Sequence, residues 1–386
     1  MHAGLQATGP SKKAGRGLRL REASFNDHGQ VAPLAARHGL SRLSYEEWSH
    51  VWRENPVYKQ LQPDWSIGWV LENGSGRIVG YIGNVPLSYE FEGRTIVAAA
   101  SHAWVVEPEY RGAALLLLER VVNDAHAELY VSNTVSVAST PGVCALGCQR
   151  VPVGAWDEQA FWVTGYRGVV ADFLVRKHVP LAPVFSYPLS AAVLLRDRVI
   201  KPAVDGADVD VEECPAFDER FDEFWDDVRR RQRHRLLAVR TREVLAWHFK
   251  HALLEDRLWI GTVTDGPRII AYALLERADV ATSPLRVVRL VDFQSLDGST
   301  ALLVPLLSWA ARKCRDAGIH KLVSVGRWLE RGELLDRVAP YRRKLSGWTY
   351  WYRARNPRLA ERLCDPGVWA PSAFDADASL VRPVSI

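Results

Sequence analysis

Methionine and cysteine are scarce in this sequence of 386 residues. The one methionine is the initiator, and the five cysteines are odd in number and show no paired Cys-x-x-Cys spacing. A disulfide framework or a zinc site is therefore not expected, and no metal ligands are assigned. No apolar run is long enough to span a bilayer, because the best candidate, residues 181–195, is broken by Pro183 and Pro188. We interpret that stretch as a buried connector.

Neither sign of charge dominates the chain. Against 49 Lys and Arg stand 45 Asp and Glu, so the formal net charge of +4 is too small to indicate a nucleic-acid partner. Residues 1–17 contain basic residues but no apolar core, which excludes a signal peptide and predicts a disordered leader on a cytoplasmic protein. Hydrophobic residues make up 48% of the sequence, enough for a large core at a length that favours two domains.

The expected secondary-structure elements follow one order twice. The shared order is helices, an antiparallel hairpin, a long strand, a helix and a further strand. In the first repeat these elements are expected at 44–54, 67–85, 94–106, 113–125 and 131–138. In the second repeat they are expected at 218–254, 258–275, 287–293, 303–314 and 322–325. A capping box at Ser44 and Glu47 marks the start of one early helix. The sequence therefore predicts an α/β protein with mixed sheets and two tandem domains. We place the first domain at 18–175, a Pro-rich connector at 176–210 and the second domain at 211–386.

The segment from Val105 to Leu116 joins the long strand of the first repeat to its next helix. It combines a strand end, a tight turn rich in small residues and a helix start. Unpaired amides and the positive end of a helix dipole make such a start suitable for an anion. Arg111 adds a permanent charge suited to phosphate. The alternative interpretation is a simple strand-turn-helix corner with one surface arginine.

This segment, which reads Val-x-Pro-x-Tyr-Arg-Gly before the helix, resembles the acyl-CoA-binding segment of the GNAT (GCN5-related N-acetyltransferase) superfamily. The order of elements matches that family over about residues 18–173, and the second repeat resembles a degenerate copy. The family motif is Q/R-x-x-G-x-G/A. Aligned from Arg111, this sequence has Ala114 where the motif prefers glycine and Leu116 where it prefers glycine or alanine. The resemblance implies acetyl-CoA or another acyl-CoA as co-substrate. Its pyrophosphate would be held by Arg111 and the amides of Gly112, Ala113, Ala114 and Leu115, and its thioester arm aligned by Val105 and Val106.

Acyl transfer also needs a group that accepts a proton from the acceptor. His102, on the strand before the turn, is the first candidate, and alternation along the strand predicts that it shares a face with Trp104 and Val106. A histidine with a purely structural hydrogen bond is the alternative. Asn133 lies on the next strand, where the resemblance implies a splay that accommodates the pantetheine, although it could instead satisfy local backbone. Cys144 lies in the helix that follows, where the resemblance implies a tyrosine acid; its thiol could take that role, but we expect it to be buried and inert.

The second repeat lacks the arginine after its strand. Asp297 in the corresponding turn would repel a phosphate, so we do not expect this repeat to bind CoA. The expected activity is transfer of an acyl group, acetyl in the first instance, from acyl-CoA to an amine of a small molecule or sugar. One alternative is a Fem-like transferase that uses aminoacyl-tRNA, which the basic run 229–235 would suit. Another is a non-catalytic binding protein with the GNAT fold.

Overall fold

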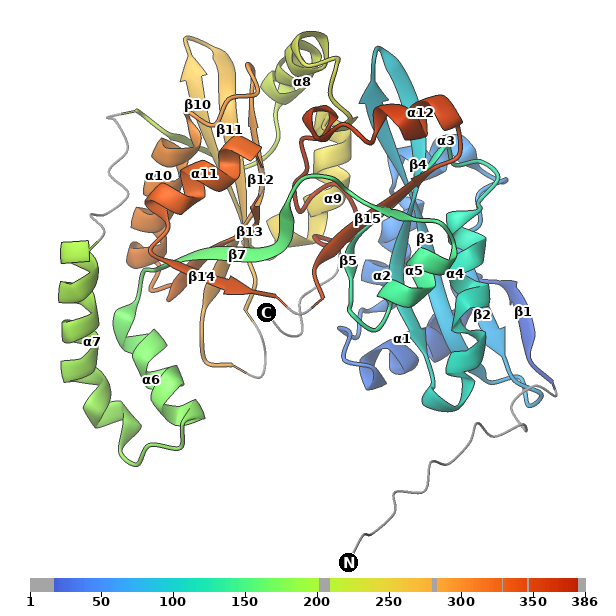
Figure 1. Cartoon of the computed structure of the whole chain (residues 1–386), viewed down its shortest axis with the longest axis horizontal. Coiled ribbons are helices and arrows are strands. Elements are labelled where there is room, and N and C mark those ends of the chain that lie inside the picture. Colours follow the sequence, from blue (N-terminus) through green and yellow to red (C-terminus); the bar gives the residue numbers. More distant parts are fainter. Residues whose placement is uncertain (1–16, 201–208, 280–282, 328, 346, 381–386) are drawn as a thin grey trace, which may run out of the picture.

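The computed structural model describes residues 17–200, 209–279, 283–327, 329–345 and 347–380, so nearly all of the expected leader lies outside the described chain. Two mixed sheets stand side by side, with helices on both faces of each and the last part of the chain running between them (Figure 1). The predicted α/β class with mixed sheets is therefore confirmed.

The first sheet is antiparallel except at one pair of strands. Its spatial order is β1 (Arg19–Glu22), β2 (Gly68–Glu72), β3 (Ile78–Phe91), β4 (Arg94–Val106), β5 (Leu129–Val135), β15 (Thr349–Ala354) and β6 (Gln149–Arg150), with β9 (Leu237–Ala238) beside β3. Strands β4 and β5 run parallel. Strand β3 continues to Phe91, beyond the end of the hairpin expected at 67–85.

The second sheet repeats this plan. Its order is β14 (Tyr341–Lys344), β7 (Ala155–Val163), β13 (Lys321–Arg327), β12 (Val287–Ser295), β11 (Arg268–Arg277), β10 (Leu258–Asp265) and β8 (Glu212–Cys214). Strands β12 and β13 are again parallel and lie beside antiparallel neighbours. The parallel pair of each sheet thus occupies the same place in the order of elements.

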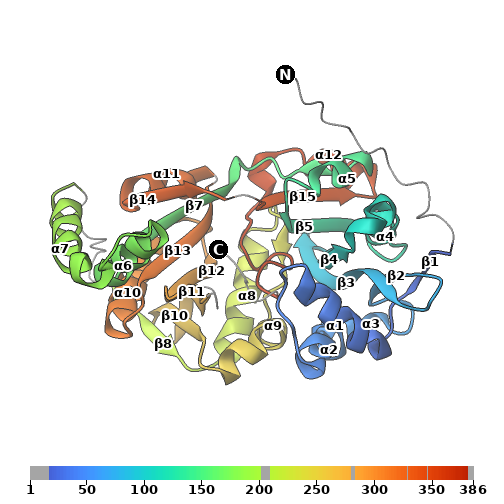
Figure 2. The same cartoon turned by 90° about the horizontal axis from the view of Figure 1, so that it is seen from below.

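Helices cover each sheet on both faces (Figure 2). The first sheet carries α1 (His28–Arg37), α2 (Tyr45–Arg53) and α3 (Pro56–Leu61) on one face, and α4 (Ala114–Val122) and α5 (Thr140–Ala145) on the other. The second sheet packs α8 (Glu219–Arg231) and α9 (Arg242–Leu254) toward the first half, and α10 (Leu303–Asp316) and α11 (Leu329–Val338) away from it. The described chain also contains the short helix α12 (Pro357–Arg362) and the 3-10 turns η1 (Phe25–Asp27), η2 (Pro108–Ala113) and η3 (Pro366–Val368).

The helix starts follow the capping signals in the sequence. The Ser44 hydroxyl accepts a hydrogen bond from the Glu47 amide at 3.2 Å, and the Glu47 carboxylate accepts one from the Ser44 amide at 2.8 Å. This reciprocal pair satisfies two amides that the first turn of α2 leaves without helical partners. The Asp218 side chain likewise accepts from the Arg220 amide at the start of α8. The predicted capping box is therefore confirmed.

The two halves exchange strands. Strand β7 belongs to the range expected to form the first domain, yet it pairs with β13 and β14 in the second sheet. Strand β15, from the range assigned to the second domain, pairs with β5 in the first sheet. The ranges 18–175 and 211–386 thus each complete the sheet of the other. Alternation of side chains marks a strand but does not name its pairing partner, so the exchange could not be predicted from the sequence.

The predicted buried connector is wrong. Residues 176–200 belong largely to α7 (Ala182–Ile200), which pairs with α6 (Tyr166–Arg176) in a helical hairpin. Pro183 falls in the first turn, where a missing N–H costs no helical bond, so it does not break the helix, and the helix continues through Pro188. Apolar side chains along this hairpin are exposed, with Leu181 at 68% and Val199 at 82%.

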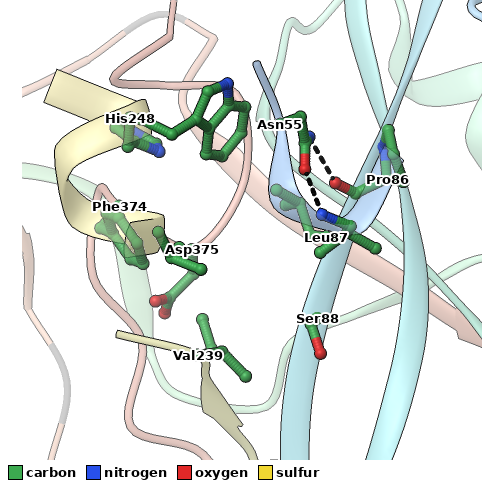
Figure 3. A pocket seen from close by; sticks show the side chains of 12 residues that line it. Asn55, Pro86, Leu87, Ser88, Val239, His248, Phe374 and Asp375 are labelled. Atoms are coloured by element: carbon green, nitrogen blue, oxygen red, sulfur yellow. Dashed lines mark hydrogen bonds between the residues drawn. The ribbon is translucent and has the colours of Figure 1, made fainter. Parts of the chain in front are cut away.

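The C-terminal segment 372–378 is buried between the sheets. The Arg240 guanidinium, which is 2% exposed, donates to the Asp292 carboxylate of β12 at 2.7 Å and to the Asp375 carboxylate of the segment at 2.7 Å. A cavity of about 20 Å³ lies beside this network, between Asn55 and Leu87 of the first half and His248 and Asp375 (Figure 3). It has room for about one water molecule, so it is a packing defect and no substrate pocket.

Replacement of Arg240 by alanine is expected to lower the free energy of unfolding by about 3–5 kcal/mol, because it leaves two carboxylates buried without a counter-charge. The measurement is urea unfolding. Arg229→Ala is the matched control, since Arg229 pairs with Asp226 at a half-exposed helix surface and its loss should cost less than about 1 kcal/mol. Similar small losses in both variants would contradict a structural role for the buried network.

Candidate active site at the opening between β4 and β5

Strands β4 and β5 separate after a short paired stretch. The parallel register joins Ala98 to Leu129 and Ala100 to Val131, and pairing ends there although β4 continues to Val106 and β5 to Val135. His102 and Asn133 come two residues after the last pair. The structure therefore brings these two predicted residues to the mouth of one opening, whose edges are backbone groups without strand partners on that side.

A bulge in β4 sets the direction of His102. The register with β3 shifts between Tyr81 and Gly83, and Ala103 has a φ of +52°. The predicted common face of His102 and Trp104 is consequently wrong. The His102 ring lies 6.1 Å from the ring of Trp52 on the α2 side, whereas the Trp104 ring lies beside Gly142 of α5 on the opposite face. A bulge inverts the alternation on which the prediction depended.

The His102 imidazole sits in an apolar environment. Its side chain is 2% exposed, and burial lowers its pKa to about 4, so the ring is neutral at neutral pH. The Nδ1 atom has no hydrogen-bond partner among the described residues. A small cavity lies next to it, bounded by Val31 and Ala35 of α1 and by Trp48 of α2. A neutral ring with one unsatisfied nitrogen can accept a hydrogen bond at this mouth or donate one, but it is a weak base.

The turn after β4 presents Arg111 to solvent. Residues 108–113 form the 3-10 turn η2, and the Arg111 side chain makes no ion pair or hydrogen bond with any described residue. The neighbouring carboxylate of Glu107 is already paired, at 2.8 Å with Arg37 and at 3.7 Å with Arg77. Since Glu107 is held by these two arginines, it does not occupy the Arg111 guanidinium, which is available for an anion, although the turn also carries the exposed Glu109.

Helix α4 begins directly after this turn and lacks a side-chain cap. Its N-cap residue Ala113 has no side-chain acceptor. The Ala114 amide donates to the Arg111 carbonyl, and the other first amides depend on water, on backbone or on a ligand. A Cβ placed on Gly112 would meet no atom within 4 Å, which leaves open space above the backbone there. Leu115 and Leu116 are 40% and 47% exposed and lie beside this space. The geometry fits an anion such as a pyrophosphate at the turn, with two leucines forming an apolar border.

The C-terminal segment reaches the same opening, which the sequence did not reveal. The Ala378 amide donates to the Asn133 side-chain oxygen at 3.2 Å, and the Thr134 hydroxyl donates to the Asp377 carboxylate at 3.0 Å. Asp377 is 4% exposed, and burial raises its pKa to about 7. The Asn133 Nδ2 group has no partner among the described residues. In the sequence, residues 373–378 show aspartates among small and aromatic residues, a pattern typical of a loop that does not predict where the segment packs.

The corresponding opening of the second repeat is occupied by protein. Pairing of β12 with β13 ends at Leu290 and Ser324. Just beyond it the Val291 carbonyl accepts from the Ala373 amide of the C-terminal segment, and Asp292 is bound by Arg240. In the following turn the Asp297 carboxylate accepts from the Ser299 amide, which lowers its pKa and keeps it anionic. Protein groups therefore occupy this opening, and the absence of CoA binding by the second repeat stays a prediction.

Other predicted features lie away from this opening. Cys144 is exposed, contrary to expectation, because α5 turns this residue toward solvent. In the basic run, Arg229 and Arg230 pair with Asp226 and Asp227 on their own helix. Within the described chain no helix has both the length and the apolar character to cross a bilayer. In the same residues no three His, Cys, Asp or Glu side chains gather as a metal site would require.

Comparison with known proteins identifies the fold. No protein-family model matches the sequence, and no curated protein sequence matches it. Among solved structures, a GCN5-related N-acetyltransferase from Anabaena variabilis is similar over 88% of this chain and 73% of its own, with a TM-score of 0.53 and 14% identity. One from Kribbella flavida covers 87% and 71%, with a TM-score of 0.52 and 14% identity.

A transferase of another kind has the same architecture. The N-myristoyltransferase of Saccharomyces cerevisiae, solved with bound myristoyl-CoA, is similar over 91% of this chain and 85% of its own, with a TM-score of 0.53 and 12% identity. These likenesses extend across both sheets, so they include the tandem arrangement. The strand opening, the turn after β4 and the similarity over most of the chain lead to one conclusion: the protein has the GNAT fold of the acyl-CoA N-acyltransferases.

Proposed function

We propose that this protein transfers an acyl group, acetyl in the first instance, from acyl-CoA to an amine of a small molecule or sugar. The observation that carries the proposal is the opening between β4 and β5, which leads to the unpaired Arg111 at the start of α4. Neighbours of the same fold are N-acetyltransferases and an N-myristoyltransferase with bound myristoyl-CoA, and they support acyl-CoA as the co-substrate. The paired arginines of α8 favour this activity over one that depends on tRNA.

The residues present fit a CoA thioester. Arg111 and the amides of Gly112 to Leu115 would hold the pyrophosphate at the helix start. The backbone of Val105 and Val106 would align the pantetheine along the free edge of β4. The unsatisfied Asn133 Nδ2 and His102 Nδ1 atoms supply polar groups at the thioester end of the opening. Such preorganised groups are suited to stabilising charge that develops on the thioester oxygen.

Two side chains compete for the role of proton acceptor. A general base works best when its pKa lies near the operating pH. The pKa of His102 is lowered to about 4, whereas that of Asp377 is raised to about 7. We therefore assign proton acceptance from the attacking amine to the Asp377 carboxylate. In this assignment His102 is a neutral hydrogen-bonding group that lines the opening.

Arg111→Ala is expected to weaken CoA binding about 10- to 100-fold, because one charge-assisted hydrogen bond to phosphate is lost. Thermal shift with CoA and acetyl-CoA measures this directly, since a ligand that binds only the folded state raises the melting temperature. Arg120→Ala, at the other end of the same helix, is the matched control and should leave the shift unchanged. No shift in the wild type, or an equal shift in Arg111→Ala, would reject the CoA site.

Asp377→Asn is expected to lower kcat by at least about 100-fold, the usual contribution of a general base. The assay is release of the CoA thiol from acetyl-CoA in the presence of a panel of small amines and amino sugars. Asp365→Asn serves as control, because Asp365 is exposed and only caps the Gly367 amide. A larger loss of kcat in His102→Gln than in Asp377→Asn would contradict this assignment and indicate that His102 accepts the proton.

The raised pKa of Asp377 also predicts a pH dependence of stability. In the folded state the Asp377 carboxyl group keeps its proton up to about pH 7, whereas in the unfolded chain it loses the proton near the usual pKa of 3.8. Between these pH values ionisation in the unfolded chain favours unfolding, so the fold becomes less stable as the pH rises. The difference in free energy of unfolding between Asp377→Asn and the wild type should therefore grow by about 3 kcal/mol, in favour of the variant, from pH 5 to pH 8. Urea unfolding at both pH values tests this, and a constant difference would contradict it.

A further inference from the structure

The helical hairpin formed by α6 and α7 projects away from both sheets (Figure 1). Its base is firmly attached, because the buried Asp197 carboxylate of α7 accepts hydrogen bonds from the hydroxyls of Tyr166 at 2.9 Å and Tyr341 at 2.7 Å. A Cβ placed on Gly168 would lie 2.4 Å from the His320 ring, so α6 packs closely against the start of β13. The hairpin is therefore an arm attached at its base, and Arg176 near the end of α6 also donates to the Ser283 hydroxyl at 3.3 Å.

The far end of this arm is apolar and exposed. We define the hairpin tip by the side chains on either side of the loop between the helices, namely Phe173, Val175, Leu181, Val184 and Phe185, which are 48–68% exposed. Most of the exposed large hydrophobic side chains of the described chain belong to this hairpin. Isolated exposed apolar residues are common on soluble proteins, but a group of this kind marks an interaction surface.

The exposed charges of the hairpin have one sign. Its exposed charged side chains with a described placement are Arg167, Arg176, Lys177 and Arg196. Both of its carboxylates are buried, where Asp172 pairs with Arg176 at 2.8 Å and Asp197 binds the two tyrosines.

The neighbouring sheet edge adds more positive charge. Burial and the proximity of Arg343 and Arg176 lower the pKa of Lys321, and burial and Arg176 lower that of Arg343. Asp172, which pairs with Arg176, offsets part of this charge, so the three cations and the one carboxylate leave a net positive charge here. Their field favours a partner that is negatively charged.

We propose that the hairpin tip docks on the surface of an anionic phospholipid bilayer, with its apolar side chains in the interfacial layer and its cations at the headgroups. Apolar residues flanked by Arg and Lys are the combination that binds such an interface. A second copy of the chain fits less well, since two such tips would bring like charges together. A nucleic acid would match the charge but would leave the aliphatic side chains of the tip without an apolar environment.

The test is flotation of the full chain with vesicles of phosphatidylcholine and phosphatidylserine, compared with vesicles of phosphatidylcholine alone. The wild type should float with the anionic vesicles only, and added salt should weaken the binding. Leu181→Asp should reduce it at least about tenfold, and so should Lys177→Glu. Leu181 has a φ of +56°, which aspartate tolerates better than leucine, so this change should not impair folding. Leu254→Asp is the matched control, because Leu254 is 74% exposed on a different helix.

Three results would overturn the proposal. The first is an absence of binding to anionic vesicles by the wild type. The second is equal binding by Leu181→Asp, Leu254→Asp and the wild type. The third is a dimer, seen by sedimentation equilibrium without lipid, that Leu181→Asp dissociates while vesicles bind neither protein, which would assign the tip to a second copy of the chain. Since none of these measurements uses acyl transfer, failure of the proposed enzymatic function would leave this test intact.

Discussion

The buried guanidinium of Arg240 joins three parts of the chain that are far apart in sequence. It follows β9, which pairs with the first sheet, and it donates to Asp292 of the second sheet and to Ser372 and Asp375 of the C-terminal segment. One cation faces two carboxylates here. Burial raises the pKa of Asp375 to about 6, whereas Arg240 holds the pKa of Asp292 below its usual value. Because buried charges tolerate little displacement without loss of their partners, this cluster sets the position of the C-terminal segment relative to both sheets.

That position has different consequences for the two repeats. Each sheet contains a parallel pair of strands that separates after a few residues, and the C-terminal segment contacts both openings. In the second repeat its backbone bonds to Val291 beside the ion pair of Asp292. In the first repeat it reaches Asn133 and brings Asp377 to the mouth, while the turn at the outer end keeps a free arginine. One chain segment therefore closes one of two similar openings and supplies a titratable group to the other.

Several features could be predicted from the sequence because they depend on neighbours along the chain. The capping box at Ser44, the helix after Arg111 and the repeated order of elements are local patterns of side-chain period and capping. The turn from Val105 to Leu116 was also recognisable, since its chemistry lies in consecutive residues. The absence of an arginine after β12 was readable in the same way. For such features the sequence by itself determined the secondary structure and the location of the turn that we propose as the phosphate site.

Tertiary structure alone decided the remaining features. Which sheet β7 and β15 join depends on pairing across more than a hundred residues, and alternation carries no label for the partner. The bulge at Ala103 reversed the expected direction of His102, because one extra residue changes the face of every side chain near it. The burial that alters the pKa values of His102 and Asp377 exists only once the helices and the C-terminal segment have packed against the first sheet. The sequence therefore determined where an anion could be held. The three-dimensional packing decided which side chains line the opening between β4 and β5, since desolvation and strand pairing are properties of the assembled fold.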